Sequence, residues 1–240
     1  MIEIEKVSVY GLEEAIRGMR NPMNSWNYSD SYHNKEEYDS LNGQKYAGTG
    51  NVDYCIGYND NKLMMNLAVG GPVHAKYRRM ITVYLDITAP LYWWKEFDTY
   101  KVGTVANSCS TMHKIHVKEF TFDDFSHEHL DDFYDYHDGI TESESTSFFR
   151  ASMLGIVYSL NVARELYLRT KDKKYWWQMI QLLPSSYNQK RTVMLNYEVL
   201  VGIYRWRKEH KLDEWREFCR WIEQLPYSEV IIGKKEEPNE

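Results

Sequence analysis

The chain has 240 residues, of which 43% are hydrophobic and 27% are charged, a balance typical of a globular protein with one or two domains. Its formal net charge of −6 argues against a general nucleic-acid coat protein, which needs a positive surface, but leaves room for a basic pocket that binds one nucleotide. The sequence has no run of about 18 apolar residues and no signal-peptide layout at its start, so no membrane association is expected.

The three cysteines, Cys55, Cys109 and Cys219, are odd in number and far apart, which predicts free thiols in a reducing cytoplasm. Aromatic residues make up 15% of the chain, with 20 Tyr and 8 Trp. Such residues either fill a core or line a ring-binding pocket or a subunit interface, and composition leaves these alternatives open.

The first third of the chain predicts a strand, a helix, a long loop and a second helix. Residues 2–9 alternate as a strand does, and apolar residues at helical spacing predict a helix over 12–20. Residues 21–58 are polar and glycine-rich, which predicts a long loop with one short helix near 35–41. Asn59-Asp60-Asn61 offers cap residues for the next helix, which we expect to end at Gly70-Gly71-Pro72.

The next stretch predicts a strand, a helix and a polar loop. Residues 81–88 place Ile81, Val83, Leu85 and Ile87 on one face and polar residues on the other, the pattern of a half-buried strand. Pro90 suits the first turn of a helix, which we expect to end near Lys101, before Gly103. Residues 104–110 are small and polar, which is typical of a loop that binds a ligand.

Residues 114–138 alternate acidic and aromatic side chains and contain His127 and His129. Two histidines with nearby carboxylates could hold a divalent metal, but the spacing matches no defined motif, and we assign no metal site. The alternative is a solvated acidic helix with aromatic anchors. We treat residues 120–146 as an acidic, aromatic insert followed by a Ser/Thr/Glu linker.

The remaining chain predicts helices over residues 147–170, 173–183 and 192–208, and a last helix that Asp213 caps. The charged residues 234–240 predict a loose tail. No internal repeat or domain boundary is evident, so the sequence predicts one α+β domain over residues 1–240.

The region from Gly70 to His113 resembles the flavin-dependent thymidylate synthases, which methylate dUMP with methylenetetrahydrofolate, FAD and a nicotinamide reductant. The matching residues are Gly70-Gly71-Pro72-Val73-His74, the strand, Ala89-Pro90, the helix, and the loop 104–113, which fits the family's Ser-x-Asn-Glu-x-Ser-x-Arg-Tyr with one extra residue, Ala106. Further on, Leu183-Pro184 is followed by Tyr187, Asn196 and Arg207, in the order of the family pattern. The resemblance implies a central antiparallel sheet with long C-terminal helices.

Position by position, the resemblance implies a set of site residues. The expected FAD-binding residues are His74, Lys101, Thr104, Asn107 and Asn196. The expected substrate-binding residues are Ser108, Ser110 and Arg207, and the candidates for catalysis are Ser110 and His113. The implied partners are a dUMP-like pyrimidine deoxynucleotide, folate and NADPH, with no nucleic-acid polymer, and the implied assembly is a homotetramer.

Asn196 and Arg207 are 11 positions apart, which on a helix leaves them within about 20° of each other. An amide and a guanidinium on one face suit a flavin edge and a phosphate. The alternative is that Asn196 is a polar residue at the start of a helix and Arg207 a partner of the helix dipole. Cys109 is either a nucleophile or a small buried hydrophobe.

At several positions the chain carries residues other than the family's. Thr99-Tyr100-Lys101 stands where the family has Arg-His-Arg, and Met112 and His113 replace the loop's arginine and tyrosine. Three functions are therefore open: a flavin-dependent methyltransferase acting on dUMP, the same fold acting on another nucleotide or base without flavin, and a non-catalytic nucleotide-binding or interaction protein.

Overall fold

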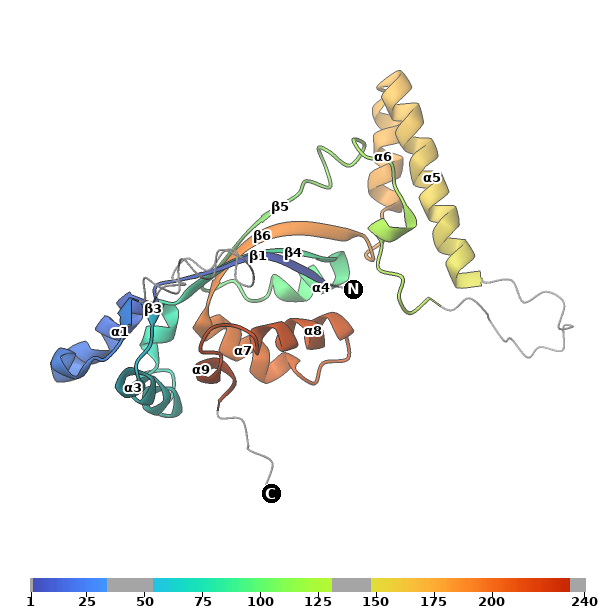
Figure 1. Ribbon diagram of the computed structural model, residues 1–240. Coiled ribbons are helices and arrows are strands. Elements are labelled where there is room, and N and C mark those ends of the chain that lie inside the picture. Colours follow the sequence, from blue (N-terminus) through green and yellow to red (C-terminus); the bar gives the residue numbers. More distant parts are fainter. Residues whose placement is uncertain (1, 34–53, 131–147, 234–240) are drawn as a thin grey trace, which may run out of the picture. The chain divides into compact units, whose positions relative to one another are not determined.

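The computed structural model describes residues 2–33, 54–130 and 148–233 (Figure 1). These fall into two compact units. The sheet unit comprises Ile2–Ile87, Phe97–Asn107 and Arg191–Glu240, and the hairpin unit comprises Thr88–Glu96 and Ser108–Lys190. The predicted single domain over residues 1–240 stays a prediction. The predicted helix at 35–41, the tail 234–240 and most of the insert and linker lie outside the described residues.

A four-stranded sheet organises the fold, with strand order β1-β4-β6-β5. Its strands are β1 (Glu3–Tyr10), β4 (Thr82–Pro90), β5 (Thr104–Ser108) and β6 (Asn188–Asn196). The alternation predicted for residues 81–88 is confirmed, because Val83, Leu85 and Ile87 are buried while Tyr84 is exposed. The mixed helix and strand architecture, with an antiparallel sheet and C-terminal helices, is the predicted one.

Two parts of the sheet differ from the prediction. Residues 104–108 form an edge strand rather than a loop, and residues 192–196 belong to β6 rather than to a helix. Val193 and Leu195 are fully buried, two positions apart, as a strand requires. The helix α7 (Tyr197–Arg207) begins only after Asn196, whose side chain caps it.

The helices of the sheet unit are mostly those predicted. They are α1 (Leu12–Arg20), α3 (Tyr58–Val69), α7, α8 (Asp213–Ile222) and α9 (Glu229–Ile232), the last of which was not predicted. In α8 the residues Trp215, Phe218 and Ile222 are fully buried, which confirms the predicted apolar face. Asp213 is the first residue of this helix rather than its cap, which is Leu212. Short elements complete the unit: η1 (Asn21–Met23), η2 (Trp26–Tyr28), β2 (Tyr32–His33), β3 (Tyr54–Cys55) and η4 (Lys76–Arg79).

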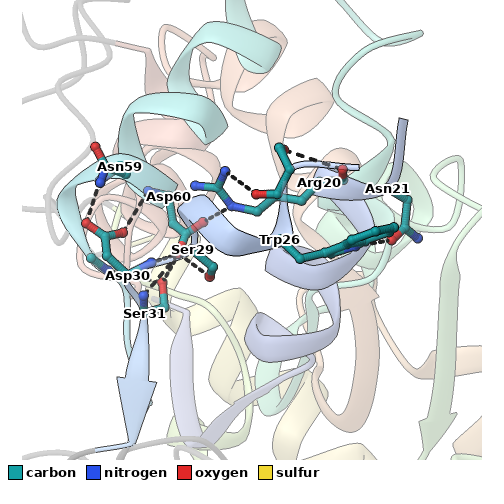
Figure 2. A network of polar contacts seen from close by, with 10 residues as sticks. Arg20, Asn21, Trp26, Ser29, Asp30, Ser31, Asn59 and Asp60 are labelled. Atoms are coloured by element: carbon teal, nitrogen blue, oxygen red, sulfur yellow. Dashed lines mark hydrogen bonds and ion pairs between the residues drawn. The ribbon is translucent and has the colours of Figure 1, made fainter. Parts of the chain in front are cut away.

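A buried carboxylate fixes the N-terminal part of the sheet unit (Figure 2). Asp60 is fully buried in the first turn of α3, and its Oδ1 accepts from Arg20 Nε at 2.6 Å. Its Oδ2 accepts from the hydroxyls of Ser29 and Ser31 at 2.7 Å each, and from the backbone N–H groups of Asp30 and Ser31 at 3.0 Å each. The predicted capping role of Asp60 is therefore wrong. Its carboxylate instead ties α1 and residues 29–31 to α3.

The hairpin unit contains α4 (Leu91–Phe97, whose last residue belongs to the sheet unit), η5 (Phe122–Asp124), α5 (Phe148–Thr170) and α6 (Lys173–Leu182). The helix α4 ends four residues before Lys101, where the prediction ended it. The helices α5 and α6, both of which were expected, run side by side (Figure 1). They bury the aromatic residues Phe120 and Phe125 of the acidic insert in a core with Leu160 and Met179.

The described part of residues 114–138 forms turns and the short helix η5 rather than a long acidic helix. His127 Nδ1 lies 2.7 Å from the carbonyl oxygen of Phe125, and its ring lies 4.2 Å from that of Phe122. Among the described residues no cluster of three potential metal ligands occurs. Nor does any helix in this part of the chain have the length and apolar character needed to cross a membrane.

Candidate functional site

The turn between α4 and β5 packs against the N-terminal end of α7. Gly103 in this turn has φ +80°, a conformation that favours glycine. A Cβ atom at Gly103 would lie 2.7 Å from Asn196 Nδ2 and 3.2 Å from Val199 Cγ2. Asn196 Oδ1 in turn accepts from the Val199 backbone N–H at 3.1 Å. The turn therefore requires glycine in order to bring its backbone against the Asn196 amide.

The other end of α7 contacts the same turn through Arg207. Its Nε donates to the Tyr100 hydroxyl at 3.0 Å, and its guanidinium carbon lies 4.7 Å from the centroid of the Trp215 ring. Stacking on Trp215 and the bond to Tyr100 fix the plane of the guanidinium group. Asn196 and Arg207 thus reach Gly103 and Tyr100 of one turn, although Asn196 is the extended cap that precedes α7 and not, as predicted, a helical residue on one face with Arg207.

Lys101 and Thr104, two further predicted residues, lie on either side of Gly103. The Lys101 side chain is exposed. Thr104 Oγ1 is buried and has no hydrogen-bond partner among the described residues. A buried hydroxyl without a partner is costly, so a ligand atom that bonds to it would be favoured.

Four predicted residues therefore surround one turn: Lys101, Thr104, Asn196 and Arg207. Asn196 also serves as a helix cap and Arg207 lies in the last turn of α7, which are the structural roles of the alternative interpretation. A cap and a stacked guanidinium keep the side chains in place, so these roles are compatible with ligand binding, and the binding roles stay predictions.

His74 is exposed, and its ring lies close to Gly70, where a Cβ atom would be 3.2 Å from His74 Cδ2. Within the described residues it makes no hydrogen bond or ion pair with the turn. Asn107 is exposed near the end of β5. The predicted roles of both residues in binding FAD stay predictions.

Residues 108–113 belong to the hairpin unit. Ser110 Oγ accepts from the backbone N–H groups of Met112 at 3.3 Å and His113 at 2.9 Å, so this hydroxyl stabilises a turn. The backbone of Cys109 is held on both sides, because its N–H donates to the Lys190 carbonyl at 2.9 Å and its carbonyl accepts from Gln189 Nε2 at 2.7 Å. Trp176 Nε1 donates to the Met112 carbonyl at 2.9 Å.

The side chains of Ser108, Cys109 and His113 are exposed along this segment. Cys109 is therefore not a buried hydrophobe, whereas Cys219 is buried in the sheet unit, where burial raises its pKa to about 12 and keeps the thiol protonated. The segment presents hydroxyl, thiol and imidazole groups to solvent, and their predicted roles in binding and catalysis stay predictions.

Two other arginines of the sheet unit, Arg78 and Arg191, have carboxylate partners. Arg191 donates to Asp98 at 2.8 Å, and Arg78, which is only 7% exposed, lies 3.7 Å from Glu198. Glu198 stands two residues after Asn196. Its negative charge is compensated within the protein by Arg78. The turn thus offers an amide, a hydroxyl, an exposed lysine and a stacked arginine.

The contributions of Tyr100, Gly103 and Trp215 to this site were not predicted. Gly103 was interpreted only as a helix stop and Trp215 only as a core residue. Periodicity shows that a residue is buried but not which cation lies on its ring, so sequence offered no signal for the contact between Trp215 and Arg207.

Comparisons with family models and with curated protein sequences gave no match. Solved structures with a similar fold include thymidylate synthase X from Helicobacter pylori, determined with FAD and dUMP. The match has a TM-score of 0.61 and 14% identity, and it covers 97% of each chain. A second structure of the flavin-dependent enzyme from that organism, also complexed with FAD and dUMP, matches with a TM-score of 0.60 and 15% identity over 96% of this chain and 97% of the other.

The UMP/dUMP methylase PolB from Streptomyces cacaoi, bound with 5-Br dUMP, is also similar, with a TM-score of 0.54 and 14% identity. That match covers 93% of this chain and 89% of the methylase. The chain therefore has the fold of the flavin-dependent thymidylate synthases over almost its whole length, and the resemblance found in the sequence is confirmed for the fold.

Proposed function

We propose that this protein is a nucleotide-modifying enzyme that binds a pyrimidine deoxynucleotide of the dUMP type and transfers a one-carbon unit to the base. The observation that carries the proposal is the shared fold over 97% of this chain and of a thymidylate synthase determined with FAD and dUMP. The similarity to a UMP/dUMP methylase bound with 5-Br dUMP supports the same substrate class.

Arg207 is the candidate for the nucleotide phosphate. A planar guanidinium held by Trp215 and Tyr100 suits the bidentate recognition of phosphate oxygens, and little side-chain entropy remains to be lost on binding. Ser108 and Ser110 are the candidates for the rest of the substrate, and Ser110 and His113 for proton transfer. Imidazole is suited to that task because it titrates near neutral pH.

The residues around the turn fit a flavin. Amide and hydroxyl groups are the partners that the carbonyl and N–H edges of a flavin ring need, and the unpartnered hydroxyl of Thr104 is such a group. We propose that Thr104, Asn107 and Asn196 hold the ring of FAD, with His74 and Lys101 beside it. When bound, FAD would supply the carrier for the one-carbon unit and the hydride, with folate and NADPH as co-substrates.

Among these five residues Lys101 is the one with a full positive charge at neutral pH. Salt readily screens the attraction between an exposed lysine and a diphosphate, so we expect FAD binding to weaken as the salt concentration rises. The test is reconstitution of the purified protein with FAD, followed by visible absorbance. A flavin spectrum whose intensity falls in the Lys101→Ala variant would support the proposal. A protein that never takes up FAD would exclude the flavin-dependent reaction.

A second candidate function is the modification of another nucleotide or base without flavin. The observation that favours it is that Arg78 and Arg191 are already paired with carboxylates, so neither is free to compensate the diphosphate of a dinucleotide cofactor. Thermal shifts with a panel of deoxynucleotides distinguish the candidates. dUMP should stabilise the protein best under the first, and a different nucleotide under the second. Complementation of a thymidine-requiring strain should succeed only under the first.

The Arg207→Ala variant tests the phosphate site under both candidates. Removing one charge-assisted pair should weaken nucleotide binding by roughly 10- to 100-fold, as measured by calorimetry. Arg205, two positions earlier on α7 and exposed, provides a matched control, since Arg205→Ala should leave the affinity unchanged. Equal affinity of wild type and Arg207→Ala would contradict the assignment. The absence of any nucleotide binding would favour a non-catalytic interaction protein.

A further inference from the structure

Three cations of the hairpin unit lie near the loop at residues 114–117 and the end of α5: Lys114, Arg164 and Lys171. None of the three has a carboxylate partner among the described residues, whereas Lys118 pairs with Asp124 at 2.8 Å and Lys174 pairs with Asp172 at 3.3 Å. The group is therefore locally positive although the whole chain has a net charge of −6, and a locally positive surface attracts anions.

Arg164 fixes the segment that carries Lys114. Its Nε donates to the His116 carbonyl at 3.0 Å and its Nη2 to the Val117 carbonyl at 3.4 Å. The Val117 N–H also donates to the Lys114 carbonyl at 3.0 Å, which closes a turn around His116. The Arg164 guanidinium and the backbone of Lys114 are therefore held by the same turn.

Lys171 approaches the same turn from the end of α5. The His116 ring meets the Tyr167 ring edge-on with centroids 5.0 Å apart, and Lys171 Nζ lies 5.7 Å from the Tyr167 centroid. His116 Nδ1 is buried and has no hydrogen-bond partner among the described residues. The charges of all three cations act on this imidazole, which has a nitrogen without a protein partner among the described residues.

The electrostatics of His116 agree with this geometry. Burial lowers its pKa below the ordinary value, and the charges of Lys171, Lys114 and Arg164 lower it further. The imidazole is therefore neutral near pH 7, and the positive charge of this group of residues comes from the three cations.

The backbone of Lys171 holds this residue in a fixed place at the end of α5. Lys171 has φ +58°, and its N–H donates to the Tyr167 carbonyl at 2.8 Å, the arrangement that ends a helix with a left-handed residue. Glycine is the usual residue in this position because side chains are strained there. A lysine here forgoes the less strained choice and adds a charge beside Tyr167.

We propose that Lys114, Arg164 and Lys171, arranged around His116, form a binding site for a phosphate group. Tetrahedral phosphate oxygens can accept from several cationic donors at once, which suits three cations on separate elements. The phosphate could belong to a small phosphorylated compound or to the backbone of a single-stranded nucleic acid. The site lies within the hairpin unit and does not depend on the proposed function, whose phosphate ligand Arg207 belongs to the sheet unit.

The test is a titration of the full-length protein with inorganic phosphate, followed through the His116 ring signal by NMR. The His116→Gln variant identifies that signal, since it is the one that disappears. We expect a saturable shift of the signal and a rise in the His116 pKa, because a bound anion compensates the surrounding positive charge. Phosphate that binds elsewhere on the protein would not change the position of the His116 signal.

Lys171→Gly removes the charge while leaving the backbone in a conformation that glycine adopts readily. We expect phosphate binding to weaken about tenfold or more. Lys174→Ala is the matched control, because this lysine is three positions away and is paired with Asp172, and its loss should change the affinity less than about twofold. Equal losses in both variants would show general screening and overturn the proposal, as would a His116 signal that does not move at about 10 mM phosphate.

A second titration, with a short oligothymidylate, distinguishes a small phosphorylated compound from the backbone of a single-stranded nucleic acid as the ligand. Binding that is at least about tenfold tighter than that of inorganic phosphate, and sensitive to Lys171→Gly, would identify a nucleic-acid backbone as the ligand. Equal affinity per phosphate would identify a small phosphorylated compound. Both results support the site, whereas oligothymidylate binding that is insensitive to Lys171→Gly, without any effect of inorganic phosphate on His116, would refute it.

Discussion

Asp60 shows how much can depend on one side chain. Burial by itself would raise its pKa, but hydrogen bonds from Ser31, Ser29 and Arg20 lower the pKa below the ordinary value. The carboxylate therefore stabilises the fold at neutral pH, and this stabilisation is lost as the pH falls through the lowered pKa. We expect Asp60→Ala to reduce the free energy of unfolding by about 3–5 kcal/mol, since Arg20 would be left buried without a partner. Urea denaturation at pH 7 measures this change.

The pair formed by Asp98 and Arg191 provides the control. Its N–O distance of 2.8 Å is close to the 2.6 Å between Arg20 and Asp60, but the Asp98 side chain is 52% exposed. Asp98→Ala should therefore cost at most about 1 kcal/mol. If both variants lose similar stability, burial is not what makes the Asp60 network important.

Lys101, Thr104, Asn196 and Arg207 lie in or beside one turn, and their binding roles stay predictions. Residue-level prediction from the sequence agrees with the structure where alternation along the chain decides the outcome, as it does for the buried Val83, Leu85 and Ile87. It failed for Asp60, because Asn59-Asp60-Asn61 resembles a capping sequence and nothing local indicates that Arg20, 40 residues away, supplies a buried partner. The hydroxyl of Ser110 likewise supports a turn that only the folded loop defines.

At the level of elements, the close contact of the α4–β5 turn with α7 makes a specific prediction for Gly103→Ala. A left-handed alanine costs about 1 kcal/mol, and the overlap of its Cβ with the Asn196 amide adds about 1–3 kcal/mol. Because the amide must move, nucleotide or flavin binding should weaken together with stability. Thermal unfolding and ligand titration of the same preparation measure the two effects.

Gly71 is the matched control for Gly103. Its φ of +88° is similar, but a Cβ atom there would meet nothing within 4 Å. Gly71→Ala should therefore cost only the conformational term of about 1 kcal/mol. A Gly103→Ala variant no less stable than Gly71→Ala would mean that the turn moves away easily and does not hold Asn196.

The elements that the sequence predicted well are long or strictly periodic, such as β4, α1, α5 and α6. The strand β5 was missed because Thr104–Ser108 is short, polar and at the edge of the sheet, where pairing with β6 rather than burial creates the strand. The start of α7 was misplaced because Val193 and Leu195 continue smoothly into a helical pattern. Only Asn196, which caps the helix, marks the boundary.

At the level of the whole molecule, the predicted homotetramer is directly measurable. A tetramer would have four times the 28.7 kDa mass of the chain in light scattering coupled to gel filtration. We expect that mass because the resemblance implies it, and because aromatic side chains such as Tyr158, which is 72% exposed, remain uncovered within one chain. A mass of one chain at micromolar concentration would contradict the prediction.

The sheet unit joins the two ends of the chain, and this has a consequence for its synthesis on the ribosome. The central strand β4 pairs on one side with β6, which is made about 100 residues later, and the Ile56 N–H donates to the Tyr227 hydroxyl, 171 residues away. Native pairing of β4 must wait until β6 leaves the exit tunnel, and the anchoring of Ile56 must wait for nearly the entire chain. A nascent chain that ends before residue 188 would leave one edge of β4 unpaired, and an unpaired strand edge is open to pairing with another chain.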